Sequence, residues 1–254
     1  MSTYEILALN YTGNVIGSGA FVRWLSDWDK QIPRTYFYWL VRKHDVNVLI
    51  DCGCRPDQAE TAELPGYVTP WEMLGRLRLS TDDIGHLVLT HLHWDHAGAL
   101  AFFPKAHIWV HHAEYHFWLE DPVARKPPFE LVSDRLCLDR LAELKGTERL
   151  TIVEQDSELL PGIRGIFAPG HTPGLMAVGV NTAQGQAVLG SDCGHMFANY
   201  ADEWPSSLIT DLPAWLRSFE KLKALAASKL LFPGHDPLMA GQYKTVAENI
   251  TKLV

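Results

Sequence analysis

The 254-residue sequence has few cysteines and no long apolar run. Its four cysteines, Cys52, Cys54, Cys137 and Cys193, show no spacing typical of a disulfide framework, and a chain of this length does not need one for stability. No run of about 18 apolar residues occurs, so no transmembrane helix is expected. These absences predict a soluble protein whose thiols are reduced.

The sequence also lacks an excess of positive charge. Lysine and arginine number 22 against 30 acidic residues, which gives a formal net charge of −8. Nucleic acids and anionic membranes bind basic surfaces, so neither is expected as a partner. The first residues show no basic segment followed by an apolar core and a cleavage site, and we therefore expect a cytoplasmic location. The oligomeric state stays open, with a homodimer as one alternative.

The composition is typical of a globular enzyme, with 47% hydrophobic and 20% charged residues. Neither a repeat nor a linker-like stretch divides the chain, which predicts a single domain over residues 1–254 with a helical or loop insertion around 121–150. Apolar and β-branched runs predict strands over 4–9, 35–42, 46–50, 86–89, 106–111, 151–154, 165–168, 177–180, 187–190 and 230–232. Helices are expected over 71–79, from 114, over 213–227, and at the C-terminus.

Histidine is abundant, with twelve residues, and its distribution is uneven. Directly after the strand expected over 86–89, the segment His91-Leu-His93-Trp-Asp95-His96 places four metal-binding side chains within six residues. Further candidates follow in Pro-Gly-His171, Gly-Ser-Asp192 and Pro-Gly-His235, each in a loop after an expected strand. Imidazole mixed with carboxylate suits zinc, in a site that keeps positions open for catalysis.

These motifs, in this order, resemble the metallo-β-lactamase superfamily, and Asp51-Cys-Gly53 resembles the early Asp-x-Gly loop of that family. The resemblance implies an α/β (α+β) fold, a four-layer αββα sandwich with a di-metal site at one edge of its two sheets. It further implies a binuclear site with two Zn²⁺ ions. The first would be held by His91, His93 and His171, the second by Asp95, His96 and His235, and Asp192 would bridge the two.

A site of this kind is suited to hydrolysis. Two zinc ions that share a carboxylate would hold a bridging water and lower its pKa toward neutrality, which makes hydroxide available. An open coordination position would polarise a substrate carbonyl. The spare oxygen of Asp95 could then carry a proton to the leaving group.

Within the superfamily, the sequence is most similar to the N-acyl-homoserine lactonases, which are quorum-quenching enzymes. The similarity rests on Phe103-Pro104 to Val110, on Glu114-Tyr115 and on Gly234-His235-Asp236. Members of that family carry a tyrosine three residues after the bridging aspartate, where it contacts the lactone carbonyl; here this position is His195, which could donate the same kind of hydrogen bond. The resemblance therefore implies a lactonase for a small-molecule lactone or ester, with Asp95 as a catalytic residue. His195 is the second candidate catalytic residue, and a structural role for it stays open as the alternative.

Other functions stay open. A catabolic lactone, another ester, a thioester or a phosphodiester could be the substrate, and a non-catalytic zinc-binding protein is a further alternative. His93 favours zinc, because iron-containing redox members resemble this motif but have glutamate at that position.

Several neighbouring residues are expected outside the ligand set. Asp51 should orient a ligand histidine by hydrogen bonding, and Cys193 is not expected to bind metal. His111 and His112 should lie at a sheet end with surface roles. An aromatic group could either line an apolar pocket or pack in the core, the second being favoured; it comprises Phe21, Trp24, Trp28, Tyr36, Tyr38 and Trp39.

Overall fold

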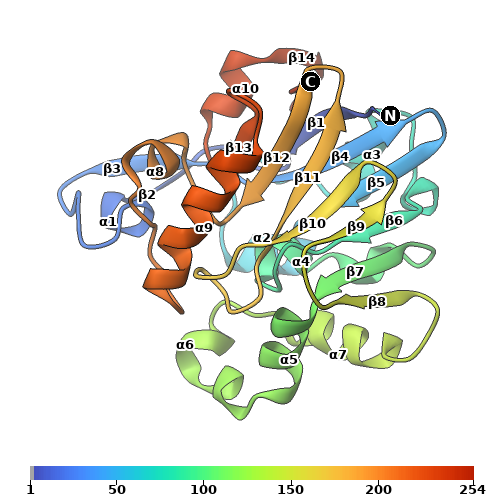
Figure 1. The fold of residues 1–254 in the computed structure, drawn as a ribbon. Coiled ribbons are helices and arrows are strands. Elements are labelled where there is room, and N and C mark those ends of the chain that lie inside the picture. The colour runs from blue at the N-terminus through green and yellow to red at the C-terminus, as the bar shows by residue number, and fades with distance from the viewer. Residues whose placement is uncertain (1–2) are drawn as a thin grey trace.

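The computed structural model describes residues 3–254, and its centre is formed by two β-sheets (Figure 1). The larger sheet has eight strands in the order β14-β15-β1-β4-β5-β6-β7-β8. Its strands from β5 to β8 run parallel, and the others pair antiparallel. The bounds are β1 (Glu5–Asn10), β4 (Phe37–Lys43), β5 (Val46–Ile50), β6 (His86–Val88), β7 (His107–His111), β8 (Leu150–Val153), β14 (Lys244–Ala247) and β15 (Ile250–Lys252).

The smaller sheet has five strands in the order β13-β12-β11-β10-β9. Its strands are β9 (Ser157–Leu160), β10 (Ile163–Phe167), β11 (Met176–Thr182), β12 (Gly185–Ser191) and β13 (Leu231–Pro233). A separate two-stranded ribbon pairs β2 (Val15–Ser18) with β3 (Gln31–Arg34). This ribbon carries residues that border the functional site.

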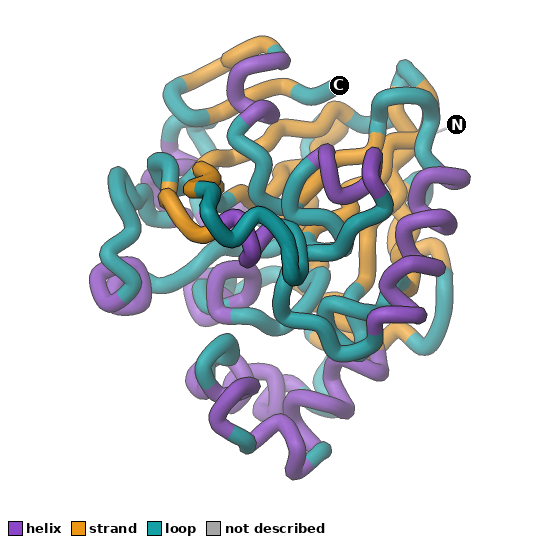
Figure 2. The backbone as a smooth tube through the Cα atoms, turned by 90° about the vertical axis from the view of Figure 1, so that its left-hand side faces the viewer, coloured by secondary structure: helices purple, strands orange, loops and turns teal. Residues whose placement is uncertain are grey.

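Helices flank the sheets, and those of residues 112–144 lie together at the lower end of the molecule in both views (Figures 1 and 2). The helices are α1 (Gly19–Val22), α2 (Pro56–Thr61), α3 (Pro70–Gly75), α4 (Trp94–Ala97), α5 (His112–Glu120), α6 (Pro127–Glu130), α7 (Arg135–Leu144), α8 (Phe197–Asp202), α9 (Leu212–Leu225) and α10 (Leu238–Gln242), with 3₁₀ turns at Thr81–Asp83, Leu100–Phe102 and Pro122–Arg125. Among residues 3–254, no helix has the length and apolarity that crossing a membrane requires.

Three apolar clusters fill the spaces between the layers. On β1, Ile6 and Ala8 join the cluster between the two sheets, whereas Leu7 and Leu9 join the cluster beneath the helices of the larger sheet. Because successive side chains of a strand point to opposite faces, a strand buried on both faces has a continuous apolar sequence. The third cluster packs α9 on the smaller sheet through Trp215, Phe219 and Leu222. This arrangement confirms the αββα sandwich.

The C-terminus departs from the expectation of a helix. Only the short α10 is helical, and the chain ends in the hairpin of β14 and β15, which turns at Asn249 with a φ of +59°. The open edge of β1 explains the difference, because β15 pairs with it and thereby buries Ile250. The helix expected over 71–79 ends at Gly75, and Arg78 has a left-handed φ of +60°.

His111 was expected to have a surface role, and this expectation is wrong. Its side chain is buried and stacks on Phe167 of the opposite sheet, with ring centroids 4.3 Å apart. Its Nδ1 accepts a hydrogen bond from the Ala113 amide and so caps α5. His112 is exposed, as expected. The four cysteines are unpaired, also as expected.

Candidate metal centre

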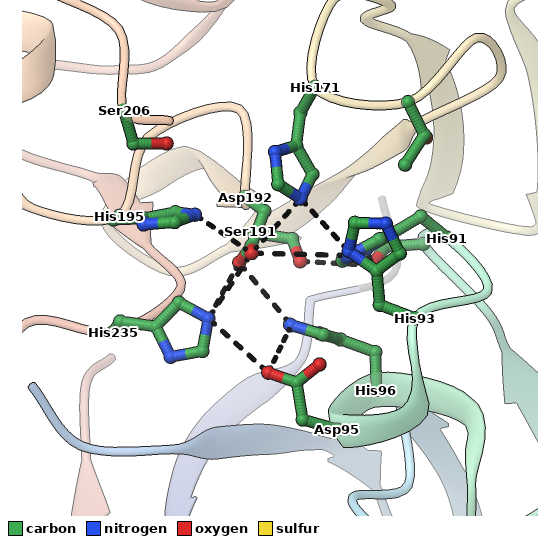
Figure 3. Close-up of polar contacts among 12 residues, drawn as sticks. His91, His93, Asp95, His96, His171, Ser191, Asp192, His195, Ser206 and His235 are labelled. Atoms are coloured by element: carbon green, nitrogen blue, oxygen red, sulfur yellow. Dashed lines mark hydrogen bonds and ion pairs between the residues drawn. The ribbon is translucent and has the colours of Figure 1, made fainter. Parts of the chain in front are cut away.

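The seven candidate ligands meet at one edge of the two sheets, although they come from four separate loops (Figure 3). His91 and His93 follow β6, and Asp95 and His96 lie on the short α4. His171 lies between β10 and β11, Asp192 follows β12, and His235 follows β13. Burial is nearly complete, since Asp95, the most accessible, has a side chain that is 13% exposed.

His91, His93 and His171 form one half of the centre. The Nδ1 atom of His93 lies 3.1 Å from Nε2 of His91 and 3.1 Å from Nε2 of His171. Burial lowers the pKa of His93 to about 4 and also lowers the pKa values of the other two imidazoles. Neutral imidazoles present free nitrogen lone pairs, which is the form that binds a metal.

Asp95, His96 and His235 form the other half. The Oδ2 atom of Asp95 lies 3.4 Å from Nε2 of His96 and 3.7 Å from Nε2 of His235. These three residues offer one carboxylate and two imidazoles around a common point. This donor set, like the three imidazoles of the first half, suits a divalent transition-metal ion.

Asp192 faces both halves of the centre, and Nε2 of His235 lies near both of its oxygens. Its Oδ1 lies 3.0 Å from Nε2 of His235, and its Oδ2 lies 3.4 Å from Nε2 of His171. The close approach requires Gly234, because a Cβ at that position would lie 2.3 Å from Oδ1 of Asp192. The carboxylate therefore stands where it could be shared between two ions.

The hydrogen bonding of His96 indicates whether the cluster could hold a cation. Its Nδ1 lies 2.8 Å from Oδ2 of Asp51 and must donate to it. Within the described residues its buried Nε2 has no hydrogen-bond partner, and it faces the carboxylates of Asp95 and Asp192 at 3.4 Å. Burial opposes protonation of His96, but these carboxylates and Asp51 raise its pKa well above the usual value. The same negative field would attract a metal ion, so the residues fit a metal site.

Asp51 behaves as expected, because it orients a ligand candidate instead of joining the cluster. It accepts hydrogen bonds from the amide and the hydroxyl of Thr90, both at 2.8 Å, as well as from His96. Asp51 thereby joins the end of β5 to the loop that carries His91 and His93. Outer hydrogen bonds of this type fix the orientation of a ligand imidazole.

Glu114 supports the opposite side of the site, and sequence reasoning missed this role. Its carboxylate is fully buried on α5 and accepts four hydrogen bonds, from the Leu92 amide, the Trp118 indole, the Thr172 hydroxyl and the Gly174 amide. Glu114 thus connects the His91–His93 loop to the loop of His171. The sequence did contain a sign of this role, because the acidic Glu114 stands beside apolar residues within His112–Glu120.

His195 and Cys193 lie on the loop after Asp192, with different surroundings. His195 is 1% exposed, and its Nε2 approaches Oδ2 of Asp192 to 3.0 Å, without hydrogen-bond geometry. Cys193 instead packs in the apolar cluster under α9, beside Tyr200 and Trp215, and burial raises its pKa. The loop therefore brings His195 to the cluster and turns Cys193 away from it.

A cavity of about 320 Å³ opens over the metal centre. Its wall includes Asp95, Asp192, His195 and His235, together with Arg34 and Tyr36. Burial raises the pKa of Tyr36 to about 12, so its phenol stays protonated. Leu131 and Val132, from the segment 121–150, also border this cavity.

An apolar groove of about 660 Å³ adjoins the cavity, and the two share Phe21 and Leu208. Trp24 and Trp28 line the groove, and Trp28 is 68% exposed. The aromatic group of the sequence is therefore divided. Phe21 and Tyr36 border the cavity, whereas Tyr38 and Trp39 are fully buried in the core.

Curated proteins similar to this chain include N-acyl homoserine lactonases. The chain is 29% identical over 216 residues to the N-acyl homoserine lactonase AiiA of Bacillus thuringiensis subsp. kurstaki, covering 78% of this chain and 80% of that protein. It is 29% identical over 225 residues to the N-acyl homoserine lactonase AiiB of Agrobacterium fabrum, covering 78% of each protein.

Solved structures share the fold. An N-acyl homoserine lactone hydrolase with the product N-hexanoyl-L-homoserine bound at its catalytic metal center superposes with a TM-score of 0.79 at 21% identity, covering 97% of this chain and 98% of that one. AidC, a dizinc quorum-quenching lactonase, superposes with a TM-score of 0.73 at 21% identity, covering 93% and 90%. The family model of the metallo-beta-lactamase superfamily matches residues 32–235, and the chain therefore belongs to that superfamily.

Proposed function

We propose that this protein is a zinc-dependent lactonase, and that N-acyl homoserine lactones are the first substrates to test. The observation that carries the proposal is a cluster of seven buried histidine and aspartate side chains that opens into a cavity of substrate size. The curated relatives named N-acyl homoserine lactonases support the reaction class. The adjoining apolar groove could accommodate an acyl chain.

We assign the ligands as the two halves of the cluster suggest. His91, His93 and His171 would hold one zinc ion, Asp95, His96 and His235 the other, and Asp192 would bind both. Bound zinc supplies Lewis acidity toward a carbonyl oxygen and lowers the pKa of coordinated water. We also propose a single domain over residues 1–254, with 121–150 as an insertion, and a cytoplasmic location.

Two residues of the cavity wall would handle protons and charge during ring opening. Asp95 lines the cavity with a partly accessible carboxylate, which would take up a proton from the attacking water and pass it to the ring oxygen as the ester bond breaks. His195 borders the same cavity and would donate a hydrogen bond to the carbonyl oxygen as negative charge develops there.

The test is hydrolysis of N-hexanoyl homoserine lactone by the zinc-loaded protein, with ring opening followed chromatographically and zinc measured in the same sample. We expect turnover that disappears on chelation and returns with zinc. Turnover of phosphodiesters alone would place the protein among other hydrolases of the superfamily. Bound zinc without turnover of any ester or phosphodiester would instead indicate a binding protein.

A further inference from the structure

Arg34 contributes a positive charge to the wall of the cavity over the metal centre. It is the last residue of β3, directly before Thr35. The Thr35 amide donates to the carbonyl of His235 at 3.0 Å, and Nδ1 of His235 donates to the carbonyl of Thr35 at 3.0 Å. Two hydrogen bonds therefore fix the backbone next to Arg34 against a residue of the metal cluster.

The guanidinium of Arg34 has no anionic partner within residues 3–254. It makes no ion pair or hydrogen bond there, and its buried Nε is without a partner. Several other arginines of the chain form ion pairs, for example Arg23 with Asp202 and Arg55 with Asp134. Because a partly buried charge is costly when unpaired, a cation left in this state at a cavity is typical of a binding group.

The position of the guanidinium is defined by its neighbours. It lies over the ring of Phe21, with Cζ 4.1 Å from the ring centroid. Gly17 is also close to the guanidinium, since an added Cβ there would approach Nη2 to 3.3 Å. The aromatic ring and the bare glycine backbone hold the planar group at the cavity, and this preorganisation favours binding.

The charge of the zinc-loaded site also favours the binding of an anion. Two divalent ions would bring four positive charges, of which the carboxylates of Asp95, Asp192 and the buried Asp51 offset three. Arg34 adds to this charge, although the chain as a whole has a net charge of −8. A cavity of this sign attracts anions.

We propose that Arg34 binds an anionic group of the substrate, so that the enzyme prefers lactones that carry a carboxylate near the ring. This inference rests on the proposed lactonase function and names its substrate class. The planar fork of arginine matches a carboxylate with two parallel hydrogen bonds. A cavity of about 320 Å³ accommodates a small carboxylated lactone.

The test compares two substrates of the same shape, γ-carboxy-γ-butyrolactone and its primary amide, with the zinc-loaded enzyme. We expect kcat/KM to be roughly ten- to a hundredfold higher for the carboxylate, because hydrogen bonds between charged groups are the stronger kind. Arg34→Gln should abolish this preference, because it lowers kcat/KM for the carboxylate far more than for the amide. Arg34→Lys should retain part of it. Arg164→Gln, which removes the same charge from an exposed position on β10, is the matched control and should change neither value.

Equal kcat/KM values for the two lactones in the wild type would overturn the inference, as would an equal loss for both in Arg34→Gln. If Arg34→Gln impaired only N-hexanoyl homoserine lactone, Arg34 would bind an acyl carbonyl instead, and the carboxylate inference would be wrong.

A binding measurement separates this inference from the lactonase proposal. The Kd values of hydroxyglutarate and its monoamide, the ring-opened forms, are measured by calorimetry on the zinc-loaded wild type and on Arg34→Gln. A preference for hydroxyglutarate that is lost in Arg34→Gln supports the inference even if no lactone is opened. The same Kd ratio in both proteins contradicts it even if lactones are opened.

Discussion

At the scale of single residues, Asp192 and Cys193 are adjacent in sequence but have opposite environments. Asp192 contacts histidines of both halves of the metal cluster, whereas Cys193 is part of the apolar cluster under α9. We predict that Asp192→Ala loses zinc and activity, because two cations would then share no carboxylate. Cys193→Ala should retain both ions and cost only about 1–2 kcal/mol of stability, as expected for trimming a small buried side chain. Elemental analysis of the two purified variants tests this; equal zinc loss would show that the ligand assignment is wrong.

His195 stands where the lactonases that the sequence resembles carry a tyrosine. Its imidazole borders the cavity and approaches Asp192. If it donates to the developing oxyanion, His195→Ala should lower kcat roughly a hundred- to a thousandfold while both zinc ions remain bound. His195→Tyr should recover part of this loss on N-acyl homoserine lactones. The measurement is kcat and KM beside zinc content. A metal-replete alanine variant with near-native turnover would exclude His195 from the mechanism.

At the scale of elements, Glu114 joins α5 to two metal-binding loops. Each carboxylate oxygen accepts two hydrogen bonds, and an amide has only one oxygen to offer. Glu114→Gln should therefore lower the free energy of unfolding by about 1–3 kcal/mol, and zinc should dissociate faster during chelation. Urea unfolding and stopped-flow chelation measure the two effects. Glu148→Gln, at an exposed position, is the control and should change neither value. An unchanged rate of zinc dissociation in Glu114→Gln would contradict the role of Glu114 in supporting the two loops.

His111 couples the start of α5 to the smaller sheet and makes stability depend on pH. Burial lowers its pKa to about 4. The unfolded chain takes up a proton near pH 6.5, so the stability due to neutral His111 is present above that pH and is lost as the pH falls toward 4. The loss should approach about 3 kcal/mol.

His111→Asn tests this dependence, because asparagine still caps a helix but does not titrate. Between pH 7 and pH 5 the free energy of unfolding should fall less in the variant than in the wild type, with zinc kept constant in both. His112→Asn, at an exposed position, should behave as the wild type does. Parallel pH profiles for the wild type and His111→Asn would contradict the burial argument.

At the scale of the whole molecule, the metal centre joins the two sheets. Its seven candidate ligands come from loops after β6 in one sheet and after β10, β12 and β13 in the other. Since ions bound only by the folded state stabilise it, we predict about two zinc ions per chain and a loss of both activity and thermal stability on chelation. Elemental analysis and thermal unfolding with and without a chelator measure this. One ion or none after growth with ample zinc would contradict a binuclear site.

The sequence alone predicted the strands with continuous apolar runs and the order of the metal-binding motifs. The strand predicted over 46–50 coincides with β5, and the strand predicted over 106–111 differs from β7 by one residue. Such strands can be recognised in the sequence because both of their faces are buried, which makes the apolar run continuous. The strands β2, β3, β9 and β14 were missed, because they are short and partly exposed and so lack a continuous apolar run; β15, with three residues, was missed with them.

The identity and spacing of His91, His93, Asp95 and His96 determine the chemistry, since ligand type and proximity within one loop are local properties of the chain. The tertiary structure decided which other residues act on that chemistry. Glu114 supports the loops only because α5 packs against them, and His111 is buried only because Phe167 of the other sheet covers it. Arg34 faces the cavity only because β3 pairs with β2 and leads into Thr35 beside His235. These roles depend on contacts between residues far apart in the sequence, which packing of the whole molecule establishes.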